Sequence, residues 1–431
     1  MLLLYSHKIT KRLNYIAKHL FRNILGVEVG FTTRVEDFIK HQGPKITYTK
    51  QPLQNEFFIR SNDLLFEQGI NDVQLNVQDW EGTPCFFRTD ERSNIPYDIF
   101  SASFYLLSRY EEYLPHVKDE LGRFPPKTSL AFQHGFLEIP VVDIWAHTFL
   151  KTLQQRFPDL SHSKPRYRFT SIVNVTISHC FALRGFGRSI GGFFLDISRF
   201  KFSRLGKRVM VWFNPGKDPY DNFARLQEIH KKFKIRTMFF FQFAAYSTHD
   251  KNISVYRNRF RYLIKAVADY SIVSLSASMA AADDVAILKE EREQLSNLIN
   301  RPVKYSRMRY NRVVVPHTYR DLTEAEFTDD YSLGYTHFLG FRAGTCTPFH
   351  FYDINMELQQ PIKVHPFVFS DYALQQCKTE EEVFSKLDPI YRNIKMLKGD
   401  FVMVFSNELL GSKHKIDWIK LYQSLLKRYY A

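Results

Sequence analysis

Apolar residues recur at helical spacing in several stretches of the chain. In residues 11–24 they stand at Leu13, Ile16, Ala17, Leu20, Phe21 and Ile24, with Gly26 just beyond, which predicts an amphipathic helix that ends at the glycine. Residues 97–114 predict a second helix. Farther along, the same spacing predicts helices over 222–232, 254–268, 283–299 and 380–395.

Short runs rich in β-branched and aromatic residues alternate with the helices of the second half. They predict strands over 169–177, 236–243, 271–275, 338–341 and 401–405. This alternation predicts a mainly parallel sheet or barrel with helices outside it. In such folds the chemistry lies where strands end and loops begin, so strand ends are the places to search for a site.

The clearest break in periodicity lies near residues 157–168, where Pro158 and Pro165 stand among small polar residues. A chain of 431 residues is too long for one ordinary core. We therefore predict two domains: a smaller α/β domain over 1–160 and a barrel-like α/β domain over 165–431.

Composition adds three constraints. The chain is 45% hydrophobic and 24% charged, which is typical of a folded globular protein. Cys85, Cys180, Cys346 and Cys377 are widely separated, which predicts reduced thiols and argues against a zinc or disulfide framework. The apolar run at the amino terminus is too short for a signal peptide, and no stretch approaches the roughly 20 apolar residues of a spanning helix, which predicts a cytoplasmic protein.

The net charge of +14 favours contact with nucleic acid or a lipid surface only if the basic residues cluster. They recur mostly singly, apart from short groups such as Lys231-Lys232-Phe233-Lys234, and no nucleic-acid signature accompanies them. We therefore expect no nucleic-acid partner, and a basic interaction module remains an alternative function.

Several long motifs resemble the polysaccharide deacetylase family of carbohydrate esterases. The first half carries Asp98–Tyr113 (DIFSASFYLLSRYEEY) and Pro140–Trp145 (PVVDIW), which resemble an uncharacterised amino-terminal domain in a bacterial subgroup of that family. The second half carries Asp329–Tyr335 (DDYSLGY) and Gly340–Cys346 (GFRAGTC). The resemblance implies a distorted (β/α)7-type barrel and metal-dependent removal of N-acetyl groups, with a divalent metal such as zinc as cofactor.

The catalytic motifs of that family are degenerate here. Where the subgroup has Thr-x-Asp-x-Asp, this chain has Asn174-Val175-Thr176-Ile177-Ser178, without either carboxylate. The His-Pro-Ser loop reads Ser276-Ala277-Ser278, Arg-x-His-Tyr reads Arg307-Met308-Arg309-Tyr310, and the terminal His-Asn reads Ser406-Asn407. Hydroxyl groups and a guanidinium cannot replace carboxylate and imidazole ligands, so we expect no bound metal.

Other residues of the motifs keep a possible binding role. The resemblance implies that Arg342 and Asp371 match the family's supporting arginine and acid, either as ligand-binding groups or as a structural pair with each other. Arg309 either binds an anion or, as the commoner alternative, faces solvent. Candidate ligand-binding residues are therefore Arg342, Asp371, Arg309, His179, Tyr310 and Asn407.

Three further patterns are weak. His179 stands beside Cys180, but neighbours on a strand point to opposite faces, which argues against a nucleophilic pair. The glycine-rich stretch from Gly185 to Gly192 has the wrong spacing for a phosphate loop and predicts a flexible active-site loop. His317, His337, His350 and His365 are expected to be ordinary surface or packing residues.

These observations predict a pseudoenzyme that binds a glycan or sugar-containing molecule in surface-polysaccharide metabolism, with a possible protein partner for the amino-terminal domain. The alternative is an active N-deacetylase with a displaced catalytic set, for which Asp371, His179 and Asp353 are the candidates.

Overall fold

The computed structural model describes residues 1–163, 165–412 and 415–430. Its first half is built on a four-stranded parallel sheet in the order β2-β1-β3-β4, which confirms a smaller α/β unit ahead of the barrel-like part. The strands are β1 (Leu2–Tyr5), β2 (Val29–Thr32), β3 (Lys45–Thr49) and β4 (Phe57–Arg60), and a small hairpin adds β5 (Gln78–Trp80) and β6 (Thr83–Cys85). The helices are α1 (Lys11–Lys18), extended by a π-helical turn over His19–Ile24, α2 (Val35–Lys40), α3 (Ile99–Leu107), α4 (Leu130–Gln133) and α5 (Val141–Arg156).

The second half contains a nine-stranded sheet in the order β12-β13-β11-β10-β9-β8-β7-β15-β14. Neighbouring strands run parallel except for the antiparallel pair β12 and β13. The strands are β7 (Arg168–Val175), β8 (Met238–Phe241), β9 (Ile272–Ala277), β10 (Tyr305–Met308), β11 (Asp329–Asp330), β12 (Phe349–Asp353), β13 (Leu358–Val364), β14 (Phe369–Ser370) and β15 (Asp400–Ser406). The predicted α/β class and mainly parallel sheet are confirmed, although the sheet is curled and has two free edges, at β12 and β14, within the described residues.

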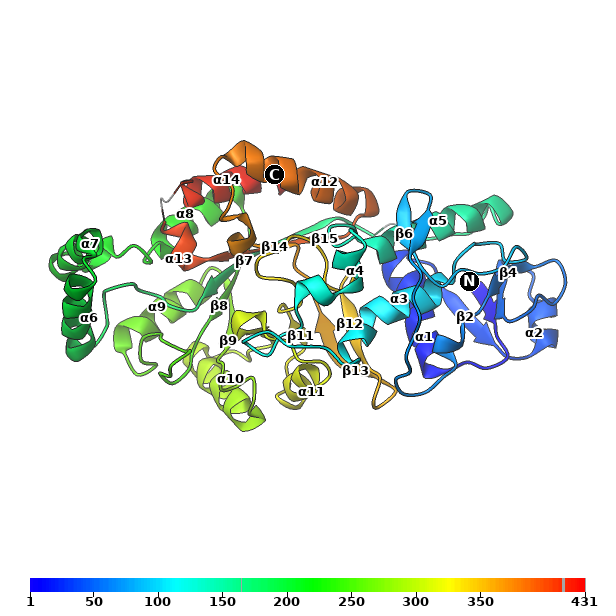
Figure 1. Cartoon of the computed structure of the whole chain (residues 1–431), viewed down its shortest axis with the longest axis horizontal. Coiled ribbons are helices and arrows are strands. Elements are labelled where there is room, and N and C mark those ends of the chain that lie inside the picture. Colours follow the sequence, from blue (N-terminus) through cyan, green and yellow to red (C-terminus); the bar gives the residue numbers. More distant parts are fainter. Residues whose placement is uncertain (164, 413–414, 431) are drawn as a thin grey trace.

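Helices pack around this sheet and follow its strands along the chain (Figure 1). They are α8 (Phe223–Phe233), α9 (Asn258–Ala268), α10 (Val285–Ile299), α11 (His317–Glu324), α12 (Glu380–Leu397), α13 (Asn407–Leu410) and α14 (Trp418–Tyr429). In the described part of the chain no helix combines the length and the apolar character needed to cross a bilayer.

Two predicted elements are wrong. Residues 338–341 form no strand, because Gly340 adopts φ +113° and its neighbour Phe341 donates its backbone N–H to Leu137 O (2.8 Å) in the first half of the chain. The glycine-rich stretch is no loop but the start of α6 (Phe186–Ser198), which forms a helical hairpin with α7 (Phe202–Phe213). Gly192 permits this packing, because a Cβ atom there would lie 2.7 Å from the guanidinium of Arg208.

The two halves share one hydrophobic core, which includes residues from both sheets. The motifs that carry the family resemblance lie at this contact. Arg342 donates to both carboxylate oxygens of Glu112 (2.9 and 2.6 Å), and Asp143 accepts the backbone N–H of Cys346 (2.9 Å). Arg342 is thus not paired with Asp371, because Glu112 from the first half occupies its planar donor face.

Candidate functional site

The carboxyl ends of β7, β10, β14 and β15 surround a cavity of about 320 Å³, which we call the strand-end pocket. The volume lies at the small end of the range for small-molecule sites. Of the residues predicted from the degenerate motifs, Thr176, Arg309 and Ser406 line it, together with the candidate ligand-binding residues Tyr310 and Asp371. Because parallel strands bring their carboxyl ends to one edge of a sheet, residues far apart in sequence meet there.

The remaining candidates lie elsewhere. Ser178 is buried and its hydroxyl contacts His179 Nδ1 (3.2 Å), while Ser276 is buried within β9 in register with Arg307. Asn407 donates its side-chain amide to Ile177 O (3.0 Å) and Tyr220 O (3.3 Å), so it joins two loops. None of these side chains lines the strand-end pocket, and neither does Arg342.

The displaced catalytic set is also not assembled. Asp371 lines the strand-end pocket, whereas His179 lines a separate surface pocket, where its Nε2 lies 3.7 Å from Asp221. Asp353 is fully buried on β12 and forms an ion pair with Arg320 (2.5 Å). Each residue has its own partners, so the three do not form a shared site.

Cys180 has no features of a nucleophile. The four cysteines are unpaired and buried. Burial is the main cause that raises the pKa of Cys180, and the nearby carboxylate of Asp218 raises it further. A thiol with a raised pKa is poorly ionised at neutral pH and reacts slowly.

Sequence reasoning missed several groups of the strand-end pocket. Glu408, Arg307, Tyr372, His337 and Arg123 all line it. Arg307 belongs to one degenerate motif and Glu408 directly follows another, so the position of these motifs at strand ends could have indicated both residues. Arg123 comes from the first half of the chain, and no local pattern indicates that contact.

Arg309 is held inside the pocket rather than facing solvent. Its side chain is 12% exposed, lies 3.8 Å from the buried carboxylate of Asp250, and stacks over the ring of Tyr310 at 4.3 Å. Its Nη2 donates to His249 O (3.3 Å). Within the described residues the Nε of Arg309 is buried and has no hydrogen-bond acceptor. The Nε of Arg309 thus has the carboxylate of Asp250 as its nearest charged neighbour, beyond hydrogen-bond distance.

Arg307 is buried at the floor of the same pocket. It donates to Tyr331 O and to Asn311 Oδ1 (both 2.5 Å), and its Nε has no acceptor among the described residues. Burial lowers its pKa to about 10, a value that still leaves it charged at neutral pH. Arg307 therefore supplies a second fixed positive charge to the pocket.

A strained turn links these arginines. Tyr310 and Asn311 both adopt positive φ, at 57° and 54°, which is uncommon for residues other than glycine. Arg307 holds Asn311, and Arg123 donates to Tyr310 O (2.8 Å). Strained backbone of this kind is retained where surrounding contacts fix it, and it concentrates at binding sites.

Two carboxyl groups face the arginines. Burial raises the pKa of Asp371 to about 7, although its oxygen accepts the N–H (2.7 Å) and hydroxyl (2.8 Å) of Ser406. Burial also raises the pKa of Glu408, which accepts a hydrogen bond from Thr176 (2.7 Å). Three guanidinium groups and two carboxyl groups thus line the pocket, and Asp119 (2.8 Å from Arg123) and Asp250 (3.8 Å from Arg309) add two carboxylates just outside it.

This pocket does not fit a divalent metal. No three His, Cys, Asp or Glu side chains lie close enough together to hold an ion anywhere in residues 1–163, 165–412 and 415–430. Arg342 does not line the pocket with Asp371, and the guanidinium groups of Arg307 and Arg309 place positive charge within it, which disfavours a bound cation. The site is instead suited to an anionic or hydroxyl-rich ligand.

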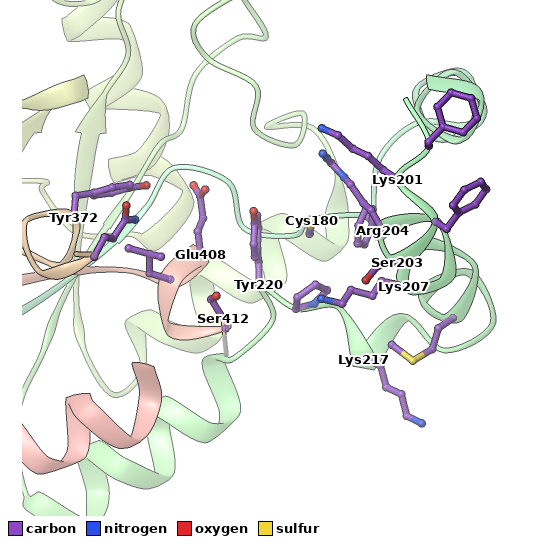
Figure 2. Close-up of a pocket in the computed structure, with 18 residues that line it drawn as sticks. Cys180, Lys201, Ser203, Arg204, Lys207, Lys217, Tyr220, Tyr372, Glu408 and Ser412 are labelled. Carbon is purple, nitrogen blue, oxygen red and sulfur yellow. The ribbon is translucent and has the colours of Figure 1, made fainter. Parts of the chain in front are cut away.

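A larger cavity of about 1130 Å³ lies beside the strand-end pocket, between the sheet and the α6–α7 hairpin; we call it the hairpin cavity (Figure 2). Lys201, Arg204 and Lys207 enter it from the hairpin, and Glu408 and Tyr372 line both spaces. The two cavities are therefore adjacent.

The titration of Asp371 gives a test of the pocket's electrostatics. Because its folded-state pKa of about 7 exceeds the ordinary 3.8, the folded chain retains a proton that the unfolded chain releases between those values. The protonated Asp371 therefore contributes its full stabilisation of the fold below pH 3.8, and this contribution is lost as the pH rises to about 7. Asp371→Asn removes this loss, so its free energy of unfolding should increase relative to wild type between pH 4 and pH 8 in urea titrations. If the difference in free energy of unfolding between Asp371→Asn and wild type does not change with pH, the pKa of Asp371 is not raised.

Fold and pocket together define a two-part α/β protein with a ligand pocket at the carboxyl ends of a curled, mainly parallel sheet. Residues 2–158 match the model of DUF7033, a family of unknown function. No curated protein matches the chain.

Solved structures similar to this chain include polysaccharide deacetylase folds. A Mycobacterium smegmatis protein described as a polysaccharide deacetylase is 12% identical, with a TM-score of 0.39 over 62% of this chain and 85% of its own. PuuE allantoinase is 13% identical, with a TM-score of 0.39 over 73% of this chain and 91% of its own. A mutant of BA3943, a CE4-family pseudoenzyme with restored enzymatic activity, is 8% identical, with a TM-score of 0.30 over 61% of this chain and 64% of its own. At these values the similarity assigns no role to any individual residue.

Proposed function

We propose that this protein is a catalytically inactive relative of the polysaccharide deacetylases, which binds a sugar-containing ligand in the strand-end pocket and acts in surface-polysaccharide metabolism. The observation that carries the proposal is the pair of buried guanidinium groups, Arg307 and Arg309, each with a donor nitrogen that lacks a hydrogen-bond acceptor among the described residues. An unpaired buried donor costs free energy until a ligand satisfies it.

The guanidinium groups of Arg307 and Arg309 favour a sugar that carries phosphate or carboxylate, including a nucleotide-linked sugar. Guanidinium groups recognise such oxyanions through paired donors, and these hydrogen bonds are stronger than those between neutral groups. Tyr310 and Tyr372 add aromatic rings that suit stacking against a sugar. The proposed ligand is therefore anionic, with a ring that fits the narrow cavity.

Calorimetric titration with two probes tests the proposal. UDP-N-acetylglucosamine should bind wild-type protein more tightly than the neutral chitotetraose, and Arg309→Ala should weaken its binding by about tenfold or more, as expected for the loss of a charged hydrogen bond. Arg428→Ala is the matched control, because Arg428 is half exposed and paired with Asp388 outside the pocket. Binding of neither probe, or equal effects of the two variants, would overturn the proposal.

A further inference from the structure

The α6–α7 hairpin exposes many more large apolar side chains than it buries. Eight of its large apolar side chains are more than one third exposed, with Phe200 at 79% and Phe213 at 87%. The others are Phe194, Leu195, Ile197, Phe202, Met210 and Trp212. In Figure 1 the hairpin stands apart at one end of the molecule. Three of these eight residues, Phe200, Phe202 and Met210, also line the hairpin cavity.

The contact between the two helices contains a buried ion pair beside one aromatic stack, that of Phe193 on Trp212 (ring centroids 5.4 Å apart). Arg208 is buried and donates to Asp196 Oδ2 through Nε (3.0 Å) and Nη2 (2.8 Å). Its guanidinium also lies 4.9 Å from the ring of Phe181, which fixes the hairpin to the body of the protein. An amphipathic pair of helices normally buries its apolar side chains against its neighbour. In this hairpin eight large apolar side chains are exposed instead, and an exposed apolar patch marks an interaction site.

The charge of the hairpin identifies its partner. Between Gly185 and Lys217 the sequence contains seven Lys and Arg residues and one acid, Asp196, which is buried against Arg208. Lys201, Arg204 and Lys207 stand on α7 or just before it and line the hairpin cavity (Figure 2). The partner is therefore negatively charged and offers apolar volume beside that charge.

We propose that the α6–α7 hairpin docks on a bilayer surface that contains anionic phospholipid. Helices with Phe, Trp and Leu on one side and basic residues beside them lie in the interface between headgroups and acyl chains. A second copy of the chain would bring equal positive charges together. A nucleic acid would match the charge but leaves Leu195, Ile197 and Met210 without an apolar environment. The surface of an anionic bilayer satisfies both requirements.

Vesicle flotation with the full-length protein tests this proposal. Wild-type protein should float with vesicles of phosphatidylcholine and phosphatidylglycerol at a 7:3 ratio, bind more weakly to phosphatidylcholine alone, and dissociate as salt is raised. Phe200→Ser/Phe213→Ser should lower the partition coefficient by about tenfold or more, since each buried methylene group contributes about 0.8 kcal/mol. Both rings are exposed, so the fold does not depend on them. Met356→Ser/Met396→Ser is the control, because these exposed methionines lie outside the hairpin.

Trp212 gives an independent optical readout. It is 42% exposed, whereas Trp80, Trp145 and Trp418 are buried. Fluorescence should shift to shorter wavelength when anionic vesicles are added, and Trp212→Phe should abolish the shift without abolishing flotation. Three results would overturn the proposal. The first is no flotation with anionic vesicles, and the second is undiminished flotation of Phe200→Ser/Phe213→Ser. The third is a wild-type dimer in the absence of vesicles that does not form in this double variant. Displacement from vesicles by a single-stranded oligonucleotide at equal phosphate concentration would indicate a nucleic-acid site instead.

Discussion

Glu112→Gln should lower the free energy of unfolding by about 3–5 kcal/mol, the cost expected when one member of a buried ion pair is removed. Glu112 is buried between two arginines: Arg342 donates to both of its oxygens, and Arg109 donates through Nε (2.8 Å). Arg109 also pairs with Glu111 (2.7 Å), so the four charges balance. Burial alone would raise the pKa of Glu112, but Arg342 and Arg109 more than offset it and hold the pKa below its ordinary value.

Urea unfolding measures this effect. Removing the charge of Glu112 leaves an uncompensated guanidinium at the contact between the two halves of the chain, so both halves should lose stability together. Glu324→Gln is the control, because Glu324 forms an exposed pair with Lys289 and such pairs contribute under about 1 kcal/mol. A similar, small effect of both substitutions would show that the buried network does not hold the two halves together.

Asp218→Ala should destabilise the base of the α6–α7 hairpin by about 2–4 kcal/mol, because four backbone N–H groups lose a charged acceptor. The buried carboxylate of Asp218 accepts the N–H groups of Cys180 (2.7 Å), Phe181 (2.7 Å), Ala182 (2.8 Å) and Tyr220 (3.0 Å). These groups lie where the chain enters and leaves the hairpin. The carboxylate therefore fixes both ends of the hairpin to the sheet.

Limited proteolysis and urea unfolding together test the role of Asp218. Asp218→Ala should be cleaved faster within residues 183–217 than wild type, whereas Asp218→Asn, which keeps one acceptor oxygen, should lie between them. If Asp218→Ala is cleaved at the wild-type rate and loses under about 1 kcal/mol, the carboxylate does not position the hairpin.

The sequence was sufficient for the class of fold because long periodic stretches dominate it. Helices α8, α10 and α12 and strands β7 and β15 lie close to their predicted positions. The two-residue strands β11 and β14 carry too little pattern to detect. The failure at residues 338–341 has a tertiary cause, since the backbone there bonds to the loop that carries Leu137.

The candidate site was only partly predictable for a similar reason. Positions in the motifs led to Thr176, Arg309, Asp371 and Ser406, which do line one pocket. Local sequence shows which residue types stand at the end of a strand, but it does not show which distant side chains they contact. A pair with Asp371 was one of two roles predicted for Arg342, and its observed partner, Glu112, lies 230 positions away in sequence. Arg123 reaches the pocket from the first half of the chain, and the sequence around it carries no pattern that indicates a ligand site.

Zinc binding is the most direct test of the central proposal, which is that fixed positive charge at the strand ends leaves no site for a divalent metal. Calorimetric titration of metal-free protein with zinc, followed by measurement of acetate released from N-acetylglucosamine oligomers, provides both readouts. We expect no saturable zinc binding at micromolar concentrations and no acetate. Stoichiometric zinc together with acetate release would contradict the claim.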